Sequence, residues 1–436
     1  VGDLATPGFA PVLNTAYNNS ATPGTVTPFP TVFGYDQARI ATATSNYNAF
    51  DKGWFSPGST ADAMTPTRGY TVNAPATATP IDFVGTFNTG AQNSGALSRG
   101  TDADAGWQLL GNPYPAPLDW STVTAAQRPG MDAAMYVYQP TGQYTGTYRT
   151  YANGVGASPL IAAGAGYFAR VSTAGGSGSV NLTNANRVTT FGGQPTFGRG
   201  TADVRPQLQL QVAGAGLTDL THLYFEAGAT AALDAEYDAP KLPNTTGLNL
   251  ASLVGQQAVA INGLPTLAGT RETVIPLTLA APAAGSFTFS VPMLANFGGT
   301  TVWLRDALTG TQQQLVAGGS YQFTLATALS GTGRFALAFR PTGALAAATA
   351  LDAANVRVFP NPAHGRFTVL LPPVADQRAV QAELLNTLGQ TVTTRTIGLT
   401  AAGARAEFET SALAKGVYML RLTAGSRTLT QRVVVE

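Results

Sequence analysis

Short segments in which apolar and polar residues alternate are the commonest pattern along the chain. Residues 207–212, 286–291 and 335–339 each place apolar side chains at every second position. Because successive side chains of a strand point to opposite faces of a sheet, this pattern predicts half-buried strands of antiparallel sheets. Turn signals such as Asn262-Gly263 and Gly318-Gly319 occur among these segments. The pattern therefore predicts an all-β protein.

Changes in composition predict the domain boundaries. The Gly-rich residues 192–200 and the Ala-rich stretch that follows Pro341 are typical of linkers. We predict tandem antiparallel β-sandwich domains, Ig-like or jelly-roll-like. The predicted parts are a first β-sandwich module over 1–200, a second sandwich over 201–341, a linker over 342–354 and a C-terminal domain over 355–436.

The first predicted module contains a weak internal repeat. Residues 68–72 precede a second apolar segment at 81–83, and residues 165–169 precede a similar segment at 180–182. Each copy has a Gly-Tyr pair, a polar turn and then another short strand pattern. This suggests duplicated hairpins within one sandwich.

The low charge of the chain excludes several classes of partner. Only 11% of the 436 residues are charged, and 24 basic residues against 23 acidic ones give a net charge of +1. No basic stripe occurs, so nucleic acid is not an expected partner. The absence of Cys excludes disulfides and thiolate chemistry. No apolar run approaches the ~20 residues that a membrane helix needs.

Residues that could carry catalysis are sparse. His222 and His364 fall in different predicted domains, and His222 is expected to be an exposed strand residue. Acidic residues cluster at 102–104 and 234–238, but neither cluster continues into a calcium-binding loop, so solvated turns are the preferred interpretation. No phosphate-binding loop and no nucleophile elbow with a downstream His is present. We therefore expect no catalysis, no metal site and no cofactor.

The aromatic segment at residues 106–120 is the most distinctive one in the first module. Trp107, Tyr114 and Trp120 surround a Gly-Asn-Pro sequence that breaks a strand. Flat rings beside amides can stack on sugars, which makes these three residues a weak candidate for a ligand platform. Aromatic residues also fill the cores and corners of β-proteins, and this is the preferred interpretation.

The C-terminal domain contains four motifs in a characteristic order. They comprise residues 356–369, 384–392, 413–422 and 431–435. This series resembles the type A C-terminal sorting domain of the type IX secretion system. The family often has Asp where this chain has Asn386, and usually has Lys where it has Arg432. The resemblance indicates the following sorting-signal residues: Pro360, Asn361, Pro362, Gly365, Gly389, Gly416, Tyr418 and Arg432.

The chemistry of these residues is consistent with a compact β-domain. Pro360 and Pro362 are expected to form a rigid turn around Asn361, while Gly389 and Gly416 are expected to supply backbone freedom at hairpins. The resemblance implies a seven-strand β-sandwich in this part of the chain.

The resemblance also implies a route and a location. The expected cell is of the Bacteroidota type, and the expected partners are the type IX secretion machinery and its sortase-like peptidase. That peptidase usually removes the domain, here by cleavage in the linker after Pro341. The mature protein would then be released or linked to surface lipopolysaccharide. We therefore expect an extracellular or outer-membrane-surface location.

The upstream part resembles a module that precedes such domains in large surface proteins, through residues 106–115, 163–168 and 237–242. We predict a secreted or cell-surface-anchored structural or adhesive β-protein that contacts itself or neighbouring surface proteins. One alternative is an accessory carbohydrate-binding region of a larger secreted hydrolase. The other is a subunit of an extracellular fibre completed by strand exchange, if Val1 follows a missing strand.

Overall fold

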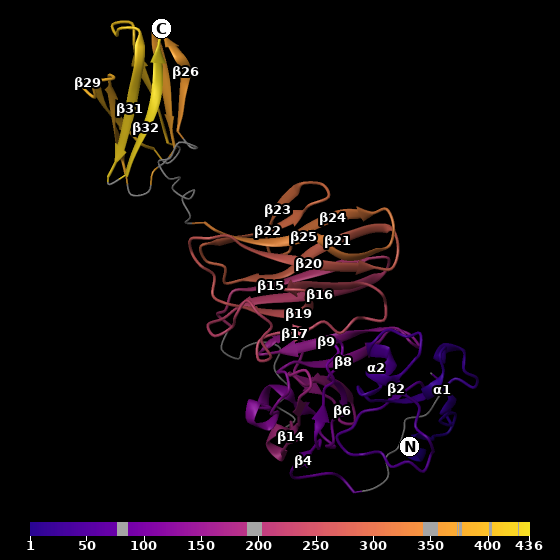
Figure 1. Cartoon of the computed structure of the whole chain (residues 1–436). Helices are drawn as coiled ribbons and strands as arrows, with labels where there is room; N and C mark the ends of the chain where they lie inside the picture. Colours follow the sequence, from indigo (N-terminus) through magenta and orange to yellow (C-terminus); the bar gives the residue numbers. More distant parts are fainter. Residues whose placement is uncertain are drawn as a thin grey trace. The chain divides into compact units, whose positions relative to one another are not determined.

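The computed structural model describes residues 1–75, 86–189, 203–342, 356–372, 374, 377–400, 403–425 and 427–436. Strands dominate these residues, which confirms the all-β prediction. The chain divides into two compact units (Figure 1). Unit 1 comprises Val1–Ala268 and Glu272–Arg340, and unit 2 comprises Gly269–Arg271 and Pro341–Glu436. In the described residues, no helix is long and apolar enough to cross a membrane.

The first part of unit 1 is built from short elements. It contains two one-turn helices, α1 (Ala16–Asn19) and α2 (Arg39–Thr42). Its 3-10 helices are η1 (Gly2–Leu4), η2 (Pro23–Thr25), η3 (Phe50–Gly53), η4 (Trp120–Thr122), η5 (Ala125–Gln127) and η6 (Asn184–Asn186). A small sheet has the order β2-β1-β3, with β1 (Val32–Tyr35), β2 (Trp54–Phe55) and β3 (Thr71–Val72).

A five-stranded antiparallel sheet forms the centre of this first part. Its order is β10-β9-β8-β12-β6, with β6 (Trp107–Gly111), β8 (Met135–Pro140), β9 (Gly146–Ala152), β10 (Val155–Gly156) and β12 (Gly166–Arg170). Three short pairs accompany it: β4 (Gln92–Asn93) with β14 (Asn181–Leu182), β5 (Leu97–Ser98) with β13 (Ser177–Gly178), and β7 (Leu118–Asp119) with β11 (Leu160–Ile161).

The second part of unit 1 is a large curled sheet of the order β23-β22-β25-β20-β18-β19-β16-β15-β21-β24, with β17 also paired to β19. Its strands are β15 (Gln207–Gly214), β16 (Leu217–Phe225), β17 (Ala239–Pro240), β18 (Asn249–Val254), β19 (Gln257–Leu264), β20 (Thr273–Ala281), β21 (Gly285–Ala295), β22 (Thr300–Asp306), β23 (Thr311–Leu315), β24 (Ser320–Leu325) and β25 (Leu329–Pro341). The segments that alternate in the sequence lie in β15, β21 and β25 as predicted, and their apolar side chains meet in one core.

The two parts of unit 1 share a second core. Tyr136 of β8 and Val155 of β10 pack in the same cluster as Tyr224 of β16 and Ile261 of β19. Figure 1 shows β8 and β9 beside β17 and β19, with the five-stranded sheet against the large one. The described residues of unit 1 therefore hold together through side chains from both parts. The predicted linker at 192–200 lies outside the described residues.

Unit 2 is a seven-stranded sheet of the order β29-β28-β31-β32-β26-β27-β30. The strands are β26 (Arg357–His364), β27 (Arg366–Leu371), β28 (Ala379–Leu385), β29 (Thr391–Gly398), β30 (Ala404–Glu409), β31 (Gly416–Ala424) and β32 (Arg427–Val435). The inward-facing residues of all seven strands form one core. In it the rings of Phe367 and Phe408 stack, with their centroids 5.1 Å apart. The predicted linker at 342–354 lies outside the described residues from 343 onward.

The internal hairpin repeat is not present as predicted. In the second copy β12 pairs with β6 and β8, whereas residues 181–182 pair with β4, so the two segments do not form a hairpin. The pairing of distant segments overrides the local similarity. In the first copy β3 pairs with β1, and residues 81–83 lie outside the described residues.

The Asn262-Gly263 turn signal is also misleading, because both residues lie inside β19. A Cβ atom at Gly263 would lie 2.6 Å from Cβ of Tyr237. The glycine is thus required by the close approach of a neighbouring segment rather than by a turn. The pairing of β19 with β16 is parallel, an exception to the antiparallel pattern.

Candidate functional site

The Pro-Asn-Pro sequence of the first C-terminal motif lies in β26, next to the last strand of the chain. Neither Pro360 nor Pro362 has a backbone N–H, so this part of β26 lacks donors for a regular ladder. The side chain of Asn361 replaces them. Its NH2 group donates to the carbonyl of Arg432 at 2.9 Å, and its Oδ1 atom accepts from the N–H of Val434 at 2.8 Å. The predicted rigid turn is therefore an extended segment that is fastened to β32 by one amide side chain.

Tyr418 and Arg432 lie on the two strands that continue this sheet. Tyr418 of β31 is 7% exposed, and its hydroxyl donates to the carbonyl of Ala414 at 2.8 Å. Arg432 of β32 is opposite Met419 and has an exposed side chain. The fold thus brings Asn361, Tyr418 and Arg432 onto three adjacent strands.

The three glycines of the motifs have different roles. Gly365 and Gly389 have φ values of 80° and 76°, in the turns between β26 and β27 and between β28 and β29. These values favour glycine, and the prediction of backbone freedom at a hairpin is confirmed for Gly389. Gly416 is the first residue of β31 and is not in the left-handed region, so the prediction of special backbone freedom is wrong there.

The candidate ligand platform in unit 1 is contradicted by burial. Trp107, Tyr114 and Trp120 are only 4%, 2% and 2% exposed. The indole of Trp120 donates to the carbonyl of Ala133 at 2.8 Å, and the hydroxyl of Tyr114 donates to the carbonyl of Gly90 at 2.7 Å. The ring faces are thus enclosed in the core, where no sugar can stack on them. This outcome matches the preferred interpretation of the segment as core and turn packing.

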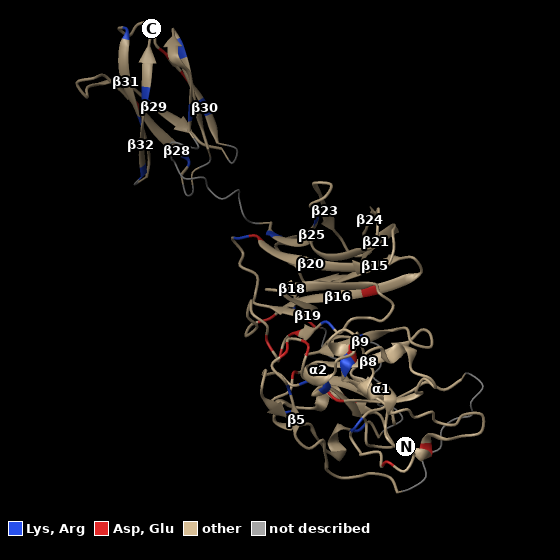
Figure 2. Ribbon diagram, turned by 45° about the vertical axis from the view of Figure 1, so that its right-hand side comes forward, with Lys and Arg blue, Asp and Glu red and all other residues tan. Residues whose placement is uncertain are grey.

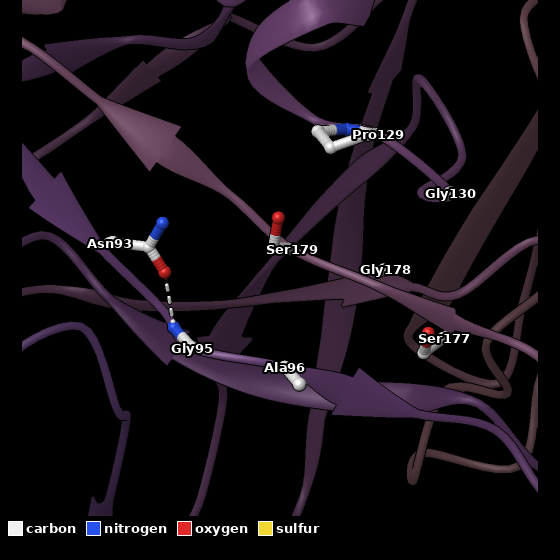
Figure 3. A pocket seen from close by; sticks show the side chains of 8 residues that line it. All are labelled: Asn93, Gly95, Ala96, Pro129, Gly130, Ser177, Gly178 and Ser179. Atoms are coloured by element: carbon white, nitrogen blue, oxygen red, sulfur yellow. Dashed lines mark hydrogen bonds between the residues drawn. The ribbon is translucent and has the colours of Figure 1, made fainter.

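A shallow groove of about 470 Å³ lies beside the short pairs of unit 1 (Figure 3). It is lined by small residues and one amide: Asn93, Gly95, Ala96, Pro129, Gly130, Ser177, Gly178 and Ser179. The Oδ1 atom of Asn93 already accepts the N–H of Gly95 at 2.6 Å. The lining contains no ionisable side chain, so the groove offers no acid, base or nucleophile pair.

The acidic cluster at 234–238 is part of the fold rather than a solvated turn throughout. Asp238 is 1% exposed and accepts backbone N–H groups from Asp234 and Gly263, each at 2.7 Å. Burial raises the pKa of Asp238 to about 7, although both hydrogen bonds oppose the shift. Glu236 forms a two-pronged ion pair with Arg128 of the first part of the unit. Among the described residues, no group of three or more His, Asp or Glu side chains is placed to hold a metal ion.

Other buried charges of unit 1 also have internal partners. Lys241 Nζ lies 2.6 Å from Asp219 Oδ2, and both side chains are 7% exposed. The same carboxylate oxygen accepts the N–H of Leu250 at 2.6 Å. Arg334 pairs with the buried Asp306 at 2.9 Å. Charged residues are otherwise few and scattered (Figure 2).

The two histidines lie in different units. His222, predicted to be exposed, is 6% exposed on β16, and burial lowers its pKa to about 4. His222 lies in a strand as predicted. The face of β16 that carries it is covered by the first part of unit 1, as the packing of Tyr224 against that part shows. His364 is exposed at the end of β26, 3.7 Å from Glu436.

Two family models match the chain. The model described as a domain of unknown function (DUF8693) matches residues 10–339. The model of the secretion system C-terminal sorting domain matches residues 357–436, and it confirms the resemblance drawn from the four motifs. No curated protein matches the chain.

Several solved structures show weak similarity. A β-glucuronidase from Parabacteroides merdae is 11% identical over 38% of this chain and 29% of its own, with a TM-score of 0.15. The BSP domain of a biofilm-associated protein is 9% identical over 83% of this chain and 84% of its own, with a TM-score of 0.18. Dimeric latent PorU from Porphyromonas gingivalis is 10% identical over 79% of this chain and 34% of its own, with a TM-score of 0.19. The chain spans less than a third of the β-glucuronidase, and no argument about function follows from scores this low.

Proposed function

Because this chain belongs to the DUF8693 family and ends in a type IX sorting domain, we propose that residues 1–340 form a structural or adhesive module without catalytic activity. The sorting domain directs export of the protein to the cell surface or the extracellular space. The module itself is then the passenger that acts there.

This proposal rests on the observation that the buried carboxylates of unit 1 bind partners within the fold. In unit 1 Asp219 binds Lys241, Asp306 binds Arg334, and Asp238 binds two backbone N–H groups. Catalytic acids and bases must reach a substrate, usually in a cleft. These carboxylates instead connect segments within the second part of the unit, and the Glu236–Arg128 pair joins that part to the first. Such pairing suits a body that bears load or presents a surface.

The shared core supports the same proposal. Aromatic residues of both parts, such as Trp107, Tyr136 and Tyr224, pack into one cluster. Large buried aromatic side chains contribute strongly to stability, since each removes a large apolar area from water. A rigid two-part body of this kind can hold a surface in place outside the cell.

We further propose that the export machinery's sortase-like peptidase removes unit 2 and that the module is released or attached to surface lipopolysaccharide. Contacts with other copies or neighbouring surface proteins belong to the same proposal. Mass spectrometry of the protein from medium and from cell surface would test removal of unit 2. Finding only the intact chain in both fractions would contradict it.

Attachment assays test the module's role. Cells that export the full chain should adhere to surfaces or to one another better than cells that export unit 2 alone. The purified full chain should leave glycan and peptide substrates intact. Equal attachment of both cell types, or hydrolysis that depends on the chain, would refute the proposal.

A further inference from the structure

The sorting domain carries an apolar area on the outside of its sheet. Strand register places Val417 opposite Val434, and Met419 opposite both Arg432 and Leu385. Directly paired residues share a face of the sheet. We call the following residues the outer apolar patch: Leu385, Val417, Met419 and Val434, with Leu388 and Val392 of the adjoining β28–β29 hairpin.

The members of the outer apolar patch are accessible to a partner. Val417, Met419 and Val392 are 40%, 37% and 40% exposed, and Leu388 in the turn is 81% exposed. Leu385 and Val434 are half-buried. The patch is not a part of the core of unit 2. The core is filled by the alternate residues of β31 and β32, such as Leu420 and Val433.

The patch interrupts the pattern that the rest of this face follows. An antiparallel sheet with one buried face normally has polar residues on the other. Further along the same strands the outer face is polar, as expected. Glu383 forms an ion pair with Arg421 at 2.6 Å, and Thr428 and Thr430 are exposed. Apolar residues are thus confined to one end of the face, and such concentration is typical of contact surfaces.

The charges around the patch indicate the partner's character. Arg432 lies on the same face beside Val434, and Lys415 immediately precedes β31. Neither side chain forms an ion pair with another described residue of the chain. Residues 356–436 contain eight Arg and one Lys against one Asp and four Glu, a difference of +4. Complementarity therefore favours a partner surface with acidic residues at its edge.

We propose that the outer apolar patch is the surface by which the sorting domain docks on a protein of the type IX export machinery. The partner surface is apolar at its centre and acidic at its edge. This inference rests on the sorting role of unit 2, which requires that the machinery bind it. A second copy of the chain fits less well, because a symmetric contact would bring the unpaired Arg432 side chains of two basic domains together.

The test compares export of full-length variants in a bacterium that has a type IX secretion system. Val417→Glu with Met419→Glu places two acids in the patch, on exposed positions of β31. The matched control, Thr428→Glu with Thr430→Glu, places the same two acids at the same spacing on β32, at the polar end of the face. We expect about a tenfold drop in the exported fraction for the patch variant, with the chain accumulating in the periplasm, and little change for the control.

Three further measurements make the result decisive. Protease resistance of the periplasmic chain should show that the patch variant is folded. A chain without residues 357–436 should not be exported at all, and its export would refute the sorting role rather than the patch. The proposal is wrong if the folded patch variant is exported as well as the control. It is also wrong if native chains form dimers that the patch substitutions disrupt while export continues.

A charge variant tests the edge of the surface separately. Arg432→Gln with Lys415→Gln keeps the apolar patch and removes the two unpaired cations. We expect the exported fraction to fall several-fold, less than for the patch variant. Unchanged export would refute the acidic edge of the proposed partner.

Discussion

The Oδ1 atom of Asn361 accepts a hydrogen bond from the backbone N–H of Val434 at 2.8 Å, so that one side chain completes the pairing between β26 and β32. The same amide donates to the carbonyl of Arg432 at 2.9 Å. Two flanking prolines cannot donate from their backbones. The amide thus gives the Pro-Asn-Pro sequence a structural purpose, which is to hold the terminal strand in register.

Asn361→Leu should weaken this attachment. The substitution removes both hydrogen bonds and leaves two backbone groups without their protein partner, at a cost of about 1–2 kcal/mol. Hydrogen exchange of the peptide that contains β32 should therefore become about tenfold faster or more. Asn361→Asp keeps the acceptor for Val434 and loses the donor, so its effect should be intermediate. Exchange rates equal to those of the native chain in both variants would contradict this role.

Gly389 and Gly416 offer a matched pair of substitutions. Gly389 has a φ of 76°, where a side chain is strained by about 1 kcal/mol. Gly416 is outside that region, and a Cβ atom there would have no atom within 4 Å. Gly389→Ala should therefore lower the free energy of unfolding by about 1 kcal/mol, whereas Gly416→Ala should leave it unchanged or slightly higher. Urea unfolding of the two full-length variants measures the difference. Equal losses would mean that Gly416 has a role in backbone geometry after all.

Local pattern was sufficient to predict the strands but not their partners. The alternation at 207–212 and 286–291 reports which side chains face a core, and β15 and β21 lie there. The alternation does not indicate which other strand each segment pairs with, so the parallel pairing of β16 with β19 was not predictable. The wrong prediction of a hairpin at 165–182 has the same cause. Its second strand pairs with β4, which lies nearly ninety residues upstream, rather than with β12.

The candidate site was predictable where a motif specifies chemistry. The four C-terminal motifs located the sorting domain, and Gly389 was correctly assigned to a hairpin turn, whereas Gly416 was not. The weak platform at Trp107, Tyr114 and Trp120 failed because aromatic residues suit both a surface and a core, and only the long-range fold decides between them. The outer apolar patch gave no sequence signal, because Val and Met are ordinary residues of any strand.

The buried pair of Lys241 and Asp219 should be sensitive to loss of one partner. Lys241→Met leaves the Asp219 carboxylate, whose side chain is 7% exposed, with the N–H of Leu250 as its remaining hydrogen-bond partner among the described residues. An uncompensated buried charge of this kind costs about 3–5 kcal/mol. The exposed pair Arg366–Glu407 is a matched control, since its side chains are 67% and 44% exposed and 4.0 Å apart. Arg366→Met should change stability by less than about 0.5 kcal/mol.

A rescue variant separates charge from packing at this pair. Adding Asp219→Asn to Lys241→Met removes the lone charge while keeping an acceptor for Leu250, so part of the stability should return. Thermal unfolding of the three chains gives the comparison. If Lys241→Met unfolds at the same temperature as the native chain, the ion pair does not contribute as described.

Asp238 should make unit 1 less stable as the pH rises toward neutrality. Burial raises its pKa from the usual range to about 7 in the folded chain. Between the unfolded and folded pKa values the folded chain therefore binds more protons, and its stability falls with pH. From pH 5.5 to 8 this amounts to a loss of about 2 kcal/mol from this group. His222 has the opposite effect below pH 6.5, because burial lowers its pKa to about 4. Its contribution to the pH dependence must therefore be removed by comparison with a variant that keeps His222.

Asp238→Asn isolates the contribution of this carboxyl group, because His222 is the same in both chains. The variant replaces one of the two carboxyl oxygens that face the N–H groups of Asp234 and Gly263 with an NH2 group, which cannot accept a hydrogen bond, so it should be somewhat less stable at pH 5.5. Its deficit should shrink or reverse by pH 8, because an amide has no proton to lose and the native carboxylate is then charged in an apolar site. Chemical unfolding at the two pH values measures the change. If the difference between the two chains is independent of pH, the proton that Asp238 retains near neutrality does not stabilise the fold.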